Sequence, residues 1–236
     1  MYRLLLLGTL AILASSPTPP APSTNYPALK ARIAEQRVDL AARHAAADAT
    51  GKAVVVQEAR EHLLQVLADS VFPAWYGTPW DFNGTTRMPG QGKIACGYFV
   101  TTVLQDLGFV LPRVKWAQLA AEPMIRRMAP HARSFSNATP ETIERWVRDQ
   151  GAGLYAAGLD AHVGFVLVRA DSVRFIHSGM VRAEEGVVSE ALDAPLNPFA
   201  WSRYRVVGRP GILTVYHFVE IFRVLDIGRL HCLIRL

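Results

Sequence analysis

One stretch, Gln91 to Gly108, constrains the fold most, because it places a single cysteine where a helix begins. The residues after Cys96 are apolar at the spacing of one helix face: Phe99, Val100, Val103, Leu104 and Leu107. Gly108 follows where a C-terminal cap is expected. Unpaired N–H groups and the helix dipole at a helix N-terminus lower a thiol pKa. Cys96 is therefore a candidate nucleophile, while a small buried core residue is the ordinary alternative for a free cysteine.

Length and composition favour one globular domain. The chain has 236 residues, half of them hydrophobic, which suffices for a sizeable core. Its net charge of +5 is spread along the chain without a basic block that contains aromatics, so we expect no nucleic-acid partner. No metal-binding spacing is present, so we expect neither a metal nor a cofactor. Cys96 and Cys232 are the two cysteines, and a disulfide between them stays open.

The first residues are typical of a secretory signal. Arg3 precedes the apolar run Leu4 to Leu13, which is too short to span a bilayer, and small residues follow it. We expect residues 1–16 to be a signal peptide, with export to the periplasm or the extracellular space and membrane contact only before cleavage. An uncleaved anchor is the alternative. Residues 17–27, rich in Pro, Ser, Thr and Ala, are predicted to be a linker.

Two helices are predicted within residues 28–70, the first over about 28–47 and the second over about 54–70, with Thr50-Gly51 as the break between them. Residues 71–210 then form the predicted catalytic domain. Residues 211–236 are unusually apolar, and their pattern assigns them no role.

Strands follow the helices, which predicts an α+β fold with an antiparallel sheet packed on the Cys96 helix. Residues 162–168 and 173–177 form a hairpin in this prediction. If Val168 pairs with Val173, His162 and His177 lie on the same face, one diagonal step apart. His162 is then the candidate base and His177 the residue that orients it. A three-residue turn would move His177 to the other face.

An aromatic loop, residues 72–84, precedes the cysteine. Its Trp75, Trp80 and Phe82 are candidate substrate-binding residues, since aromatic loops often line a binding groove. A lid that packs over the core is an equal alternative.

Four motifs together resemble the NlpC/P60 family of papain-like cysteine peptidases and amidases. They are Tyr76-Gly-Thr-Pro-Trp80, Ala95-Cys96-Gly-Tyr-Phe-Val100, His162-Val-Gly-Phe-Val166 and Phe175-Ile-His177-Ser-Gly179. The resemblance implies a papain-like fold, a Cys96–His162–His177 site, secretion, and a peptide or amide substrate, with cell-wall peptides among those implied. It also implies an oxyanion hole. Gln91 resembles the oxyanion-hole glutamine of papain-like enzymes, and Tyr76 competes because the NlpC/P60 pattern has a tyrosine there.

The chemistry expected of this site is acyl transfer, with Cys96 attacking an amide carbonyl, a thioester intermediate and final hydrolysis by water. Two alternatives stay open. One is a catalytically silent module that binds peptide or glycan on the same fold, and the other is an acyltransferase.

Overall fold

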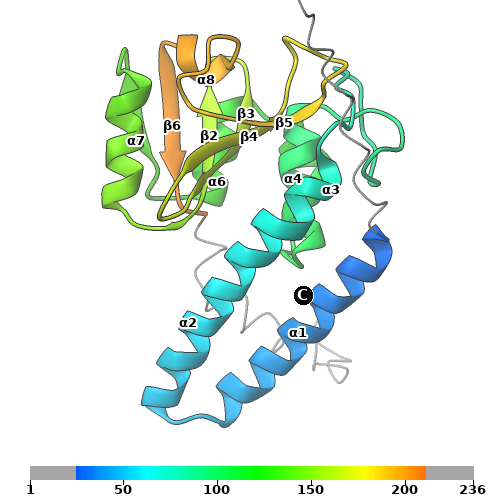
Figure 1. Ribbon diagram of the computed structural model, residues 1–236, viewed down its shortest axis with the longest axis vertical. Helices are drawn as coiled ribbons and strands as arrows, with labels where there is room; N and C mark the ends of the chain where they lie inside the picture. The colour runs from blue at the N-terminus through cyan, green and yellow to red at the C-terminus, as the bar shows by residue number, and fades with distance from the viewer. Residues whose placement is uncertain (1–24, 211–236) are drawn as a thin grey trace, which may run out of the picture.

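The structure, a computed structural model, describes residues 25–210 (Figure 1). The helices of this part of the chain are α1 (Tyr26–Ala46), α2 (Ala49–Val66), η1 (Leu67–Val71), α3 (Phe72–Trp75), α4 (Cys96–Asp106), α5 (Arg113–Ala117), α6 (Ala121–Met128), α7 (Pro140–Asp149) and α8 (Pro198–Trp201). Its strands are β1 (Arg133–Ser136), β2 (Gly153–Leu159), β3 (Val163–Val168), β4 (Val173–Ser178), β5 (Val187–Glu190) and β6 (Tyr204–Gly208). Three predicted segments lie outside these residues: the signal peptide, the first part of the linker and the apolar tail.

A six-stranded sheet forms the centre, in the order β1-β6-β2-β3-β4-β5 with every neighbouring pair antiparallel. This confirms the predicted α+β class and the antiparallel sheet. The elements β1, β5 and α8 were not predicted, and α3 lies in the stretch predicted as an aromatic loop; each of the four has only four residues. Segments that short carry too few positions to show a period.

Helices cover both faces of the sheet (Figure 1). On one face, α4 and α6 pack against inward-pointing side chains of β3, β4 and β6, such as Phe165, Ile176 and Val206. On the other, α7 and α8 cover Val166 and Phe175, which alternate with the first set along the strands. The sheet is therefore buried on both sides, which explains why β3 is apolar at every position.

The N-terminal helices differ from their predicted bounds. Helix α1 begins at Tyr26, inside the predicted linker, because the Asn25 side chain accepts a hydrogen bond from the Ala28 N–H and Pro27 lies in the first turn. Thr50-Gly51 does not end a helix. Both residues lie in the first turn of α2, whose cap is Asp48, and the Gly51 N–H donates to the Asp48 carboxylate at 2.7 Å.

Helix α2 continues through the predicted domain boundary at residue 70. It passes into the π-helical turn η1 and then into α3, which contains Pro73. Proline has no N–H, and its ring displaces the carbonyl four residues earlier. The helix therefore takes one extra residue in this turn, and the Phe72 N–H donates to the Leu67 carbonyl, five residues back instead of four.

Helices α1 and α2 form an antiparallel hairpin that projects from the sheet (Figure 1). Their buried side chains, from Tyr26 to Leu63, belong to the same core cluster as those of α4 and β3. Among residues 25–210, no helix combines the length and the apolar character needed to cross a bilayer.

Candidate active site

Cys96 is the first residue of α4, as the sequence predicts. The loop before it is fixed from two sides. The Ala95 N–H donates to the Gly84 carbonyl at 2.9 Å, and the Ser178 hydroxyl of β4 donates to the Ile94 carbonyl at 2.7 Å. Gly84 is required there, because a Cβ atom would lie 2.6 Å from the Ile94 nitrogen. The helix start is thereby tied to the strand that carries His177.

Gly97 permits a second close approach at the start of α4. A Cβ atom on Gly97 would lie 2.3 Å from the Ala117 carbonyl oxygen, so the end of α5 passes directly over this turn. Residues 117 and 119–121 thereby form one wall of the pocket in front of Cys96.

His162 comes directly before β3, in a turn held by Asp160. The two carboxylate oxygens of Asp160 accept the Arg203 N–H at 2.8 Å and the Tyr204 N–H at 2.9 Å, from the start of β6. The Leu159 N–H donates to the His162 carbonyl at 2.8 Å, which closes the turn. The His162 backbone is therefore fixed to two neighbouring strands.

The predicted register of the histidine hairpin is confirmed. Val168 pairs with Val173 and Phe165 with Ile176, across a four-residue connection. His162 and His177 meet on one face, both buried, with 2.9 Å between Nε2 of His162 and Nδ1 of His177.

Glu190 of β5 extends this pair, and sequence reasoning missed it. Its carboxylate accepts a hydrogen bond from Nε2 of His177 at 3.0 Å, and it is also paired with Arg182. Glu190 lies opposite Phe175 in the ladder, one diagonal step from His177. A strand signal over residues 187–190 would have revealed the contact, but that segment is too short to give one.

The hydrogen bonds fix which ring nitrogens carry protons. A carboxylate accepts only, so Nε2 of His177 is the donor to Glu190. Nδ1 of neutral His177 must then accept, and Nε2 of His162 donates to it. This leaves Nδ1 of His162 unprotonated, and the same atom is buried without a hydrogen-bond partner. His162 therefore presents a lone pair, the form that a general base needs.

Burial keeps the site uncharged at rest, except for the carboxylate. Burial first, and then the neighbouring His177, holds the pKa of His162 well below its ordinary value of 6.5. The pKa of His177 is lowered by burial as well, against the opposing effect of Glu190. The hydrogen bond from His177 lowers the pKa of Glu190, which is therefore ionised at neutral pH.

Cys96 differs from expectation in its pKa. Burial raises the pKa of its thiol above the ordinary 9.0 and outweighs the backbone hydrogen bonds of Val163, Gly97 and Cys96 itself, which lower it. The helix N-terminus acts in the predicted direction, but the loss of hydration of the partly buried thiol has the larger effect on its pKa. The resting pair is thus a neutral thiol and a neutral imidazole.

Cys96 and His162 line the same open pocket, with a volume of about 240 Å³. Its other lining residues are small or apolar, except for Asp160. A reacting carbonyl that entered this pocket would lie beside both residues.

The remaining predicted site residues do not line this pocket. Gln91 is exposed in the loop before Cys96. Tyr76 lies beside Ser189 and Arg174 of the sheet and is 40% exposed. Neither lines the pocket of Cys96, and the oxyanion-hole assignments stay predictions.

The aromatic loop divides into a core residue and surface residues. Trp75 is fully buried, and its Nε1 donates to the Tyr26 hydroxyl at 2.8 Å, so it is a core residue and not part of a groove wall. Trp80 is half-buried and Phe82 is 78% exposed.

Within residues 25–210, no group of three or more His, Cys, Asp or Glu side chains is arranged to hold a metal ion. Comparison of the chain with family models, with curated proteins and with solved structures finds no match. The resemblance to the NlpC/P60 family therefore rests on the four motifs alone.

Proposed function

We propose that the protein is a cysteine hydrolase that cleaves an amide or peptide bond. One observation carries the proposal. A buried series of hydrogen bonds from Glu190 through His177 to His162 leaves the Nδ1 lone pair of His162 without a partner. His162 lines the same pocket as Cys96. A structural histidine pair needs no such unpaired nitrogen, because a buried polar atom without a partner costs about 1–3 kcal/mol.

The reaction begins at the neutral pair. The Cys96 sulfur bonds to the amide carbon while its proton passes to Nδ1 of His162. The C–N bond then breaks, the amine leaves with the proton from His162, and a thioester remains. Water attacks the thioester and gives its proton to His162, the acid is released, and Cys96 recovers its thiol. His177 and Glu190 stabilise the imidazolium that forms twice in this cycle.

The NlpC/P60 resemblance supports peptides as the substrate class, cell-wall peptides among them, and export as the setting. The papain-like fold type belongs to the same proposal. The site itself requires only an acyl group that enters the pocket in front of Cys96.

An acylation assay tests the proposal without a known substrate. The full chain with Cys232→Ser, which retains Cys96 as its one thiol, is mixed with p-nitrophenyl acetate at pH 7, and acetylation is followed by intact mass. We expect transient acetylation of Cys96, abolished by Cys96→Ala and slowed about 100-fold or more by His162→Ala.

A thiol that stays unmodified, or one that reacts equally fast without His162, would contradict the hydrolase and favour a silent binding module. Addition of an amine then separates hydrolysis from acyl transfer, because a transferase yields the amide and a hydrolase yields acetate.

A further inference from the structure

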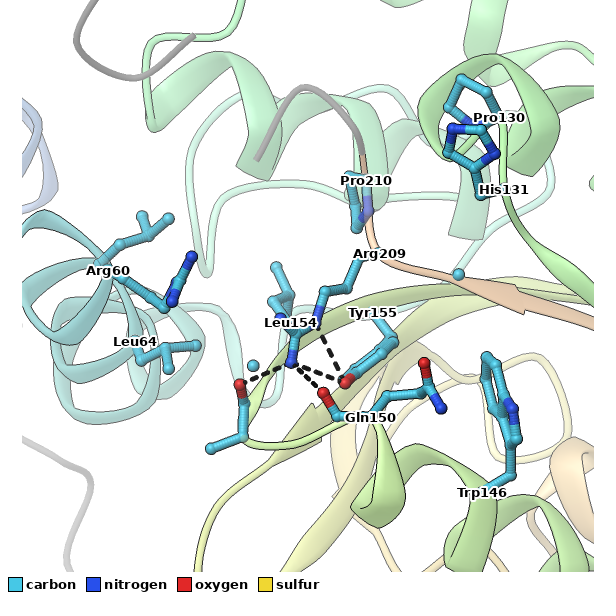
Figure 2. A pocket seen from close by; sticks show the side chains of 14 residues that line it. Arg60, Leu64, Pro130, His131, Trp146, Gln150, Leu154, Tyr155, Arg209 and Pro210 are labelled. Atoms are coloured by element: carbon cyan, nitrogen blue, oxygen red, sulfur yellow. Dashed lines mark hydrogen bonds between the residues drawn. The ribbon is translucent and has the colours of Figure 1, made fainter. Parts of the chain in front are cut away.

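A second groove lies at the opposite end of β2 from the turn that holds His162 (Figure 2). It has a volume of about 320 Å³ and shares no lining residue with the pocket of Cys96. Helix α2, the end of α7 and the ends of β2 and β6 surround it. Its apolar surface comes from residues such as Leu64, Pro130, Trp146, Leu154 and Pro210.

The charges around this groove have one sign. Arg60 and Arg209 line it, and its lining contains no Asp or Glu. The Arg209 guanidinium donates to the carbonyls of residues 150–152, at 2.8 Å for Gln150, and to the Tyr155 hydroxyl, all of them neutral acceptors (Figure 2). Within the described residues, no carboxylate forms an ion pair with Arg60 or Arg209.

We propose that this groove binds an amphipathic anion: a carboxylate attached to an acyl chain of medium length. The apolar surface of the groove buries the acyl chain of the ligand away from water, and each methylene buried raises the affinity about fourfold. The positive charges of Arg60 and Arg209 attract the carboxylate, while Nε and Nη2 of Arg209 stay bonded to neutral acceptors. A volume of about 320 Å³ suits a small ligand, at the lower end of the range for ligand pockets. The inference does not depend on the chemistry of Cys96.

Trp146 supplies a local reporter, because its ring lines the groove. The probe is 11-bromoundecanoate, whose bromine quenches tryptophan fluorescence on contact, added to the full chain below its micelle concentration. We expect saturable quenching that disappears in Trp146→Phe. The neutral 11-bromoundecan-1-ol should need about fivefold higher concentration, because it lacks the charge that the arginines attract.

Substitutions within the groove separate the binding of the acyl chain from the binding of the carboxylate. Leu64→Asp should abolish the quenching, since it places a negative charge against the chain and the carboxylate. Arg60→Gln should weaken the binding of the acid about threefold and leave that of the alcohol unchanged. Val54→Asp is the control, because Val54 lies on the same helix but is 61% exposed and outside the groove.

Absence of quenching in the full chain, or quenching that persists in Leu64→Asp, would overturn the proposal. Equal affinity for acid and alcohol would overturn its anionic part. Binding that appears only after removal of residues 211–236, which follow Pro210, would assign the groove to that segment instead.

Discussion

Glu190 determines which nitrogen of His162 carries a proton, although its hydrogen bond is to His177. Because a carboxylate cannot donate, the direction of both hydrogen bonds in the chain is fixed. A residue that donates at position 190 would reverse both bonds and protonate Nδ1 of His162. In the proposed reaction Glu190 would thus act on His162 through His177, as a positioning residue.

Glu190→Gln tests this at the residue scale. The amide both donates and accepts, so the reversed arrangement becomes populated and the base is blocked. We expect acylation of Cys96 to slow about 10–100-fold, the range for loss of an orienting partner. The dependence of the acylation rate on pH should change as well. Glu185→Gln is the matched control, because Glu185 pairs with the same Arg182 at 3.0 Å but does not contact His177. Equal rates in the two variants would contradict the positioning role.

The pKa directions also predict the pH profile of acylation. In the proposed reaction His162 serves as the base above its pKa, which lies below 6.5, and the thiol keeps its proton up to a pKa above 9.0. The rate should therefore be nearly constant between about pH 6.5 and 9. In His162→Ala only the thiolate reacts, so the rate should rise about tenfold per pH unit over that window. A wild-type rate that rises in the same way would show that His162 takes no proton.

At the scale of elements, an aromatic cluster joins α4 to the sheet. The Phe99 ring lies 6.0 Å from that of Phe165 on β3 and 5.9 Å from that of Trp75, measured between centroids. All three side chains are fully buried. The cluster fixes the helix that carries Cys96 against the strand that follows His162.

Phe99→Ala should destabilise the fold by about 3–5 kcal/mol, the usual cost of a cavity left by a buried phenylalanine. Phe82→Ala removes the same ring from a side chain that is 78% exposed, and should cost less than about 0.5 kcal/mol. Urea denaturation of both variants gives the comparison. Similar losses would mean that the cluster contributes little to stability.

The sequence predicted the elements with long periods and clear caps. The start of α4 at Cys96 and the register of the histidine hairpin are confirmed. Glu190 was missed because a four-residue strand has no period to detect, and Trp75 was misassigned because aromatic residues near Pro and Gly occur in both loops and cores. The pKa of Cys96 depends on burial, which only the packed structure reveals.

At the scale of the whole molecule, the buried histidines couple folding to pH. Their pKa values are lowered in the folded state, so the unfolded chain binds more protons once the pH falls below 6.5. The stability that neutral histidines provide is complete above 6.5 and is lost as the pH falls below it. Glu190 adds a loss only below its ordinary pKa of 4.5.

The melting temperature should therefore fall between pH 7 and pH 5, before the carboxylates titrate. His177→Gln removes one of the two buried imidazoles and should reduce the slope. His131→Gln is the control, because His131 is exposed. The same slope in all three proteins would show that the buried histidines do not govern the acid sensitivity.

The hairpin between β3 and β4 also limits how the protein can change during evolution. Side chains alternate along a strand, so one residue inserted into the connection at 169–172 shifts the pairing and moves His177 to the opposite face. Insertions elsewhere on the surface alter a loop, but this one removes the partner of the base in a single step. Functional descendants should therefore vary in this connection by substitution, or by changes in length that keep His162 and His177 on the same face of the sheet.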